Sequence, residues 1–258
     1  MSTKATHTNA KQQQLLLDIG PEATPPTLTN FVAGDNIELV ARLGALGDPG
    51  VFDQVYLWGP PGCGRSHLLR GTLAAAQAQG RPVCFVEGAQ LGAELALPPG
   101  SLVIVDDVDA LNETAQITLF RTFNAARLVG LALLLAGNEP PLRLRQTLRE
   151  DLRTRIGSAL IYEVRPLGDA EKAEALRHYG ESRGMRLDDA LIGYLLHHGR
   201  RDLPSLLAVL DAADRVSLEL KRPLTLPLLR EILQTSLDLQ PSREINATNE
   251  QKHEPGIV

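Results

Sequence analysis

The sequence predicts an α/β protein: a doubly wound parallel sheet followed by a small α-helical lid domain. Short, nearly continuous apolar runs alternate with helical segments up to about residue 166, and a glycine-rich loop joins the first run to a helix. After residue 167 only helical patterns remain. Continuous apolar runs are typical of parallel strands that are covered on both faces. Their alternation with helices favours a doubly wound sheet.

Each expected strand is bounded by glycine, proline or charged residues. The strands are expected at 54–58, 82–86, 101–106, 130–136 and 159–164, with helices at about 36–46, 66–79, 112–127 and 142–154. In the lid, helical patterns cover 169–184, 188–198, 202–221 and 225–235. A chain of 258 residues is long enough for such a core with a small second domain.

The chain divides into four expected segments. A flexible N-terminal segment, 1–27, carries a short apolar island at 14–19. A nucleotide-binding α/β domain covers 28–166, and the helical lid covers 167–236. The polar tail, 237–258, is expected to be disordered because its composition cannot form a core.

The composition and net charge of the chain argue against several classes of function and location. The net charge of −5 argues against non-specific nucleic-acid binding as the main activity, because such binding depends on neutralising phosphates; a local basic patch stays open. The two cysteines fit no metal or disulfide pattern, so a reducing compartment is expected. No apolar run reaches the length of a membrane span and the N-terminus is polar. We therefore expect a cytoplasmic protein with no membrane partner.

The glycine-rich loop has the pattern of a P-loop, G-x-x-x-x-G-[K/R]-[S/T]. It reads Gly59-Pro60-Pro61-Gly62-Cys63-Gly64-Arg65-Ser66. A strand precedes it and a helix, expected from Ser66, follows, which is the context that the motif requires. Glycines let successive backbone N–H groups converge on a phosphate, and the helix N-terminus adds partial positive charge. Ser66 is placed to reach a Mg²⁺ ion.

Arg65 departs from the usual lysine of this motif. An arginine is a planar fork, whereas a lysine is a compact ammonium, so the two fit the phosphates differently. We expect nucleotide binding to survive and the transition-state geometry to change. The alternative is a glycine-rich turn with a chance arginine, which the strand and helix around it disfavour.

Two acids end the third expected strand. Asp106 and Asp107 follow Leu102-Val103-Ile104-Val105, at the sheet edge where α/β proteins bind ligands. Asp106 is expected to hold Mg²⁺ through water, and Asp107 stands where a water-activating acid would be. The alternative is a helix cap, a role that Asp109 and Asn112 could also take.

Asn138 follows the fourth expected strand and precedes two prolines. Beside the P-loop, its side chain could orient the attacking water or sense the third phosphate of a nucleotide. A plain turn asparagine is the alternative.

Two arginines have two interpretations each. Arg155 ends a basic-rich segment and could complete the nucleotide site of a neighbouring molecule, although spacing alone favours a solvated helix face. Arg201 precedes a long lid helix and could fold back on the phosphates, or be surface charge.

The order of these motifs resembles a known family. The P-loop, LVIVDD, LLLAGN, DLRTRI and GRRDLPSL together resemble the AAA+ core of the bacterial replication initiator DnaA, over about 28–236. Residues 28–34 resemble the entry of its nucleobase pocket, where Val32 is expected to contact the nucleotide. The initiator's N-terminal and DNA-binding domains are expected to be missing. The remainder is similar to the Hda family of DnaA-related regulators, whose P-loop also carries arginine, as in Gly64-Arg65-Ser66-His67.

The apolar island 14–19 resembles the clamp-binding peptide of that family, which is of the type QLxLPL. Gln14, Leu15, Leu17 and Ile19 match, and Asp18 stands at the proline position. The resemblance implies docking on the DNA polymerase III β sliding clamp, and contact with DNA through the clamp. Packing of this peptide on its own domain is the alternative.

The resemblance also implies roles for the site residues. Arg155 matches the arginine finger that acts on ATP held by DnaA, and Arg201 matches the lid arginine that senses nucleotide. The resident cofactor would be ADP or ATP with Mg²⁺, and His67 is expected to be among the residues that bind it. The implied function is regulatory inactivation of DnaA, with weak or no turnover of its own. Alternatives are a helicase loader or nucleic-acid remodelling ATPase, and a pure adaptor; a homo-oligomer stays open.

Overall fold

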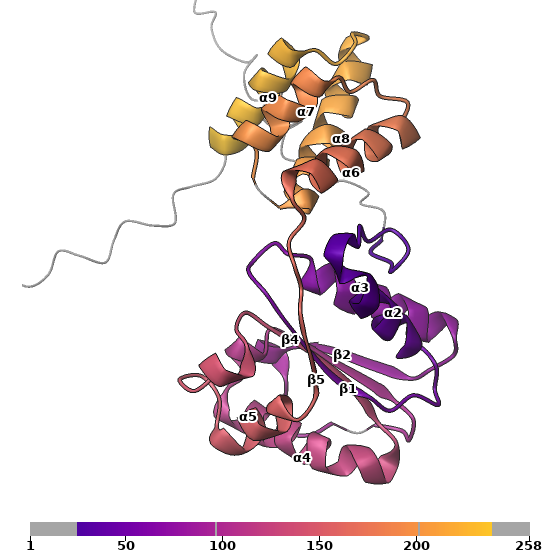
Figure 1. Ribbon diagram of the computed structural model, residues 1–258, viewed down its shortest axis with the longest axis vertical. Helices are drawn as coiled ribbons and strands as arrows, with labels where there is room; N and C mark the ends of the chain where they lie inside the picture. Colours follow the sequence, from indigo (N-terminus) through magenta and orange to yellow (C-terminus); the bar gives the residue numbers. More distant parts are fainter. Residues whose placement is uncertain (1–24, 96, 201, 239–258) are drawn as a thin grey trace, which may run out of the picture.

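The computed structural model describes residues 25–95, 97–200 and 202–238. A parallel sheet with helices on both faces forms one part, and a bundle of helices forms the other (Figure 1). No helix in these ranges is long and apolar enough to cross a membrane.

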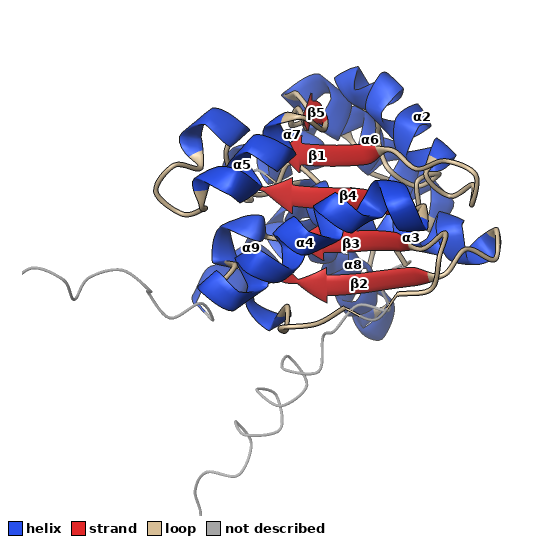
Figure 2. Cartoon of the chain, turned by 90° about the horizontal axis from the view of Figure 1, so that it is seen from below, coloured by secondary structure: helices blue, strands red, loops and turns tan. Residues whose placement is uncertain are grey.

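The sheet has five parallel strands in the order β2-β3-β4-β1-β5, seen one above another in Figure 2. They are β1 (Gln54–Trp58), β2 (Val83–Glu87), β3 (Leu102–Asp106), β4 (Ala132–Gly137) and β5 (Leu160–Glu163). This arrangement confirms the doubly wound sheet and places each strand within two residues of its predicted start. Since the strands are parallel, the loops that leave β1, β3 and β4 lie along one edge.

Helices cover both faces of the sheet. On one face lie α2 (Ile37–Ala45) and α3 (Arg65–Ala78), and on the other lie α4 (Glu113–Val129) and α5 (Glu150–Gly157). Short 3-10 turns are η1 (Gly34–Asn36), η2 (Gly88–Gln90), η3 (Val108–Ala110) and η4 (Pro141–Arg143). Strand residues alternate between the two cores: in β4, Leu134 faces α2 and α3, whereas Leu133 and Leu135 face α4 and α5.

One predicted helix was wrong. The range 142–154 contains the turn η4, a stretch of turns and then only the first half of α5, which starts at Glu150. Leu144 and Leu148 are nevertheless buried, at the four-residue spacing that predicted a helix. A smaller difference concerns α3, which begins at Arg65 and not at Ser66.

The lid consists of α6 (Asp169–Ser182), α7 (Asp189–His198), α8 (Leu203–Leu220) and α9 (Leu226–Asp238). These helices enclose a hydrophobic core of their own, centred on Leu176, Leu195 and Leu210. Aspartates cap two of them: Asp188 accepts from the amide of Leu191 at 2.8 Å, and Asp202 from that of Ser205 at 3.0 Å.

Asn36 ties the connection between sheet and lid to the start of the core. Its buried carboxamide donates to the carbonyls of Ala33 at 3.0 Å and Arg165 at 2.9 Å, and accepts from the amide of Arg165 at 2.9 Å. Arg165 lies between β5 and α6. One side chain thus fixes the path of the chain into the lid.

Candidate nucleotide site

The loop between β1 and α3 has the backbone of a phosphate cradle. Gly62 and Gly64 have φ values of 80° and 104°, a region that residues with a side chain rarely adopt. A Cβ at Gly64 would lie 2.8 Å from the Phe31 ring, and one at Gly62 would lie 2.7 Å from Cβ of Asp202. No side chain caps the N-terminus of α3, so its first backbone N–H groups are left for an anion.

The side chains of the loop divide into two groups. Ser66 and Pro60 are exposed, whereas Cys63 is buried beneath the loop. Burial raises the pKa of the Cys63 thiol, so it stays protonated and acts as packing. Gly59 permits close approach to the chain that leaves β5, since a Cβ there would lie 2.7 Å from the carbonyl oxygen of Val164.

Arg65 reaches across to the tip of β4. Its guanidinium donates to the carbonyl of Gly137 and, at 2.7 Å, to the side-chain oxygen of Asn138. The cation of the P-loop is thereby bonded to the neighbouring strand. Asn138 is likewise no plain turn residue, because its side chain is engaged by the P-loop.

Asp109 completes this connection from the other side. Its Oδ2 accepts the backbone N–H of Asn138 at 2.6 Å and the side-chain N–H at 3.0 Å. The Asn138 amide is held with its nitrogen toward Asp109 and its oxygen toward Arg65. The sequence raised Asp109 only as a helix cap, yet Asn112 caps α4 by accepting from the amide of Ala115 at 2.9 Å.

Acidic side chains gather along this edge. Asp106 ends β3, and Asp107 follows it in the left-handed region with φ 55°. Partial loss of water raises the pKa of the Asp107 carboxylate, the neighbouring Asp109 and Asp106 raise it further, and Arg65 opposes the rise. A negative edge of this kind is suited to a cation between protein and phosphate.

A cleft of about 510 Å³ lies between the start of the core and the lid. It is lined by Asn30, Val32 and Gly34, by His178 and Tyr179 of α6, and by Leu207 of α8. The volume is in the range of small-molecule sites. Val32 therefore lies in the wall of a cleft large enough for a small molecule.

His67 contacts Asn30, one of the residues that line this cleft. Its Nε2 lies 3.0 Å from the carbonyl oxygen of Thr27 and 2.9 Å from Oδ1 of Asn30, and its ring packs on Phe31. Burial lowers the pKa of His67, so the neutral form is favoured. The side chain holds residues 27–31 against α3.

Arg155 lies apart from this site, on the face of the sheet opposite α3. It is exposed near the end of α5, and its guanidinium carbon is 6.0 Å from the centroid of the Phe120 ring. Within the described ranges no carboxylate forms an ion pair with it. Arg201 and the residues Gln14, Leu15, Leu17 and Ile19 lie outside the described part of the chain.

Among the described residues, the loop and the strand tips have the chemistry that the phosphates of a nucleotide require. The glycine backbone, the uncapped helix and the acids at the strand tips lie along one edge of the sheet, and a cleft of suitable size lies between the start of the core and the lid. The described residues contain no cluster of three or more His, Cys, Asp or Glu able to hold a metal. Ser66 and Asp106 would therefore need phosphate oxygens and water to complete a Mg²⁺ shell.

Comparison with known proteins supports this arrangement. Residues 169–233 match a family model described as the Hda lid domain. The fold is similar to domain III of the replication initiation protein DnaA from Thermotoga maritima, with a TM-score of 0.67 and 17% identity over 81% of this chain and 95% of that one.

Two further structures share the fold. AMPPCP-bound DnaA from Aquifex aeolicus has a TM-score of 0.61 and 20% identity, over 72% of this chain and 64% of that one. The Holliday junction branch migration motor RuvB from Thermotoga maritima has a TM-score of 0.62 and 18% identity, over 82% and 72%. The chain thus shares the fold of these structures, and the match of residues 169–233 to the Hda lid domain confirms the resemblance to that family in this part of the chain.

Proposed function

We propose that this AAA+ protein with an Hda-type lid is a negative regulator of replication initiation that acts on DnaA. Docked on the DNA-loaded β sliding clamp in the cytoplasm, it would stimulate hydrolysis of the ATP that DnaA holds. The observation that carries the proposal is Arg155: an exposed arginine, without an ion pair in the described ranges, on the face of the sheet opposite its own P-loop. Such a cation is free to enter the nucleotide site of another molecule.

The chain's own site would hold ADP or ATP. Backbone amides from Gly62 to His67 would surround the phosphates, Val32 would contact the base, and Arg201 would approach from the lid. Ser66 and Asp106 would hold Mg²⁺, which neutralises phosphate charge when bound. Bound nucleotide would stabilise the core and lid together by mass action.

The chain's own hydrolysis of ATP should be weak. Arg65 is bonded to the β4 tip, and its partner Asn138 presents an oxygen, not an N–H, in that direction. Asp107 is shorter than the glutamate that would reach an attacking water. The groups that would act on a third phosphate are therefore engaged elsewhere or too short.

A mixing experiment tests the proposal. The chain is added to ATP-loaded DnaA with the DNA-loaded clamp, and phosphate release is followed. The unchanged chain should accelerate hydrolysis, and Arg155→Ala should reduce that acceleration by roughly 10³-fold, the order expected of an arginine finger. Arg153→Ala is the matched control, because it removes the same charge from α5. No acceleration by the unchanged chain, or equal loss in both variants, contradicts the proposal.

A second candidate is an ATPase that loads a helicase or remodels nucleic acid by its own turnover. The similarity of fold to a branch migration motor is the observation in its favour. Steady-state ATPase of the chain alone separates the two, since a motor requires turnover without DnaA. A pure adaptor would show neither turnover nor an effect of Arg155→Ala.

A further inference from the structure

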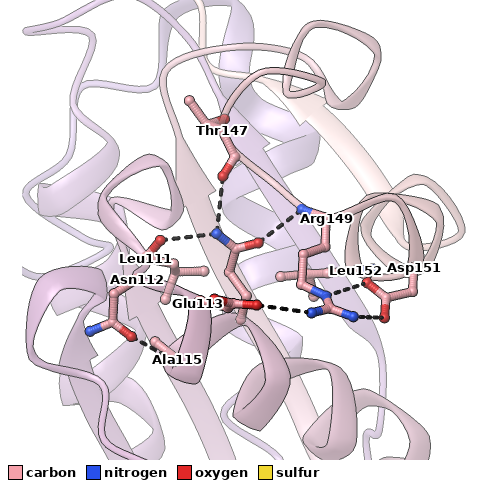
Figure 3. Close-up of polar contacts among 9 residues, drawn as sticks. Leu111, Asn112, Glu113, Ala115, Thr147, Arg149, Asp151 and Leu152 are labelled. Atoms are coloured by element: carbon pink, nitrogen blue, oxygen red, sulfur yellow. Dashed lines mark hydrogen bonds and ion pairs between the residues drawn. The ribbon is translucent and has the colours of Figure 1, made fainter.

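Gln116 joins two loops on the face of the sheet that carries Arg155. It is 7% exposed, on the side of α4 that faces the core. Its side-chain nitrogen donates to the carbonyls of Leu111 and Thr147, both at 3.0 Å, and its oxygen accepts from the amide of Arg149 at 2.8 Å. In Figure 3 the dashed lines from Leu111, Thr147 and Arg149 meet at one unlabelled amide side chain, and the printed bonds identify it as that of Gln116. Both donors and the acceptor of the amide are thus used.

These contacts determine where α5 begins. Thr147 and Arg149 are among the last residues before the helix, and Arg149, its N-cap, makes no capping bond with its own side chain. The Gln116 bonds to this segment span 31 and 33 residues of sequence. Gln116 therefore supplies the buried polar anchor for a segment that is otherwise made of turns.

Other polar contacts at this point are weaker. Arg149 pairs with Glu113 at 3.5 Å and with Asp151 at 3.4 Å, and all three side chains are substantially exposed (Figure 3). Exposed ion pairs contribute little to stability and are screened by salt. Among the polar contacts, the buried amide bonds are therefore the ones that hold the start of α5, beside the buried leucines Leu148 and Leu152.

The position of Arg155 depends on this start. α5 has only eight residues and two buried apolar side chains, Leu152 and Ile156, which lie one turn apart. Arg155 precedes Ile156, and its exposed side chain carries the guanidinium 6.0 Å from the centroid of the Phe120 ring on α4. With a fixed start and these two contacts, the helix has one register on α4; without the fixed start, small shifts of the helix displace the guanidinium.

We propose that Gln116 is a positioning residue for Arg155: it holds the first turn of α5 so that the exposed guanidinium stands in one place. The inference rests on the proposed action of Arg155 on nucleotide held by DnaA. Gln116 does not touch that nucleotide; it acts through the backbone of α5. Misplacement by about 1 Å is enough to cost on the order of 100-fold in rate.

Two substitutions and a control test this. Gln116→Met keeps the length of the side chain and removes all three bonds, whereas Gln116→Glu keeps the acceptor for the Arg149 amide. Thr118→Val is the matched control, because buried Thr118 also lies on α4 and donates at 2.8 Å to the carbonyl of Ala93, away from α5. Each variant is assayed below its own melting temperature.

Stimulated hydrolysis is measured as a function of chain concentration, with ATP-loaded DnaA and loaded clamp. Gln116→Met should lower the maximal rate by about 10- to 100-fold and leave the half-saturating concentration within about twofold, because the docking surfaces stay intact. Gln116→Glu should retain more of the rate, and Thr118→Val all of it. Amide exchange at Arg149 should be faster in Gln116→Met and unchanged in Thr118→Val.

Two results overturn the inference and differ from each other. If the unchanged chain stimulates and Gln116→Met matches it, or loses rate only as much as Thr118→Val does, then Gln116 does not position Arg155 and the proposed function stands. If the unchanged chain gives no stimulation, the proposed function and the inference fall together.

Discussion

Arg65 donates to the side-chain oxygen of Asn138 at 2.7 Å, so the cation of the P-loop is bonded to the tip of the adjacent strand. The same amide is held on its other side by Asp109. A lysine has no planar fork with which to reach both this oxygen and the carbonyl of Gly137. The arginine therefore changes what the neighbouring polar groups can do, and not only how the phosphates are held.

Arg65→Lys should release Asn138 and raise the chain's own ATP hydrolysis. Nucleotide binding should stay within about tenfold, since the positive charge remains beside the phosphates. Calorimetric titration with ADP and phosphate release with ATP measure the two effects. Arg70→Lys, an exposed position on the same helix, is the control. Complete loss of binding in Arg65→Lys would contradict the placement of the phosphates in this loop.

Asp107→Asn should raise thermal stability at neutral pH. The pKa of Asp107 is raised above 3.8 by lost hydration and by Asp109 and Asp106, so the folded state binds its proton more tightly than the unfolded state. Stability is therefore lost as the pH rises from 3.8 through the folded-state pKa, and the loss persists at about pH 7. Asparagine removes this cost and tolerates φ 55°.

Melting temperatures of Asp107→Asn and the unchanged chain, compared at about pH 7 and about pH 4, measure this linkage. The difference should shrink at the lower pH, because a larger share of the native carboxyl is protonated there than at neutral pH. The gain is expected to be small because the side chain is exposed. A variant that is less stable than the unchanged chain at neutral pH would show that Asp107 is not strained by its acidic neighbours.

Asp109→Ala should have the opposite effect at the same cluster. It removes the acceptor of both N–H groups of Asn138, and because Asn138 is exposed and can bond to water instead, we expect a loss of about 0.5–1.5 kcal/mol in the free energy of unfolding. Denaturant titration measures it. Glu219→Ala, at an exposed position of the lid helix α8, reports the effect of removing one acid from an acidic chain. Equal results for the two would mean that the Asn138 bonds contribute nothing.

Asn36→Ala should loosen the connection to the lid. It leaves the amide of Arg165 without its acceptor, at an expected cost of about 1–3 kcal/mol. Asn112→Ala removes one helix cap and should lower the free energy of unfolding by about 1 kcal/mol, which gives a loss to compare with that of Asn36→Ala. Chemical denaturation of both variants gives the comparison. An Asn36→Ala chain no less stable than Asn112→Ala would remove Asn36 from this role.

The clamp peptide gives a prediction outside the described residues. Changing Leu15 and Leu17 together to Ala should abolish capture of the chain by immobilised β clamp, because apolar side chains supply most of the affinity of such short peptides. Nucleotide affinity should be unchanged, and its measurement serves as the control. Capture that survives the double change would place clamp contact elsewhere or remove it.

The sheet could be predicted from sequence because its strands are buried on both faces. The strand Leu102–Asp106 is apolar up to its last residue, a carboxylate, so the sequence indicates both that it is a buried strand and where it ends. The helix over 142–154 could not be predicted correctly. Leu144, Leu148 and Leu152 repeat every four residues and are all buried, yet only the last is helical. The turns between them depend on bonds from Gln116, far away in sequence.

The candidate site was predictable only where a local motif carries the chemistry. The P-loop and the acids after β3 are such motifs. Asn36 and Gln116 were missed because their partners are backbone groups 129 and 33 residues away. One feature of the sequence could have indicated a role for Gln116: it is a polar residue beside the core positions Ala115 and Leu119 of an amphipathic helix. The bond from Arg65 to Asn138 gave no signal, because it depends on the adjacency of β1 and β4.

The close approach of Gly62 to Asp202 has a consequence for how long a nucleotide stays bound. The first residue of the cradle and the cap of α8 leave no space for a methyl group between them. Any side chain at Gly62 would hold α8 away from the loop, and dissociation would then be faster even where the initial encounter is unchanged. If a nucleotide binds as proposed, its residence time would thus depend on the absence of a side chain at Gly62, through a contact made by a different part of the fold.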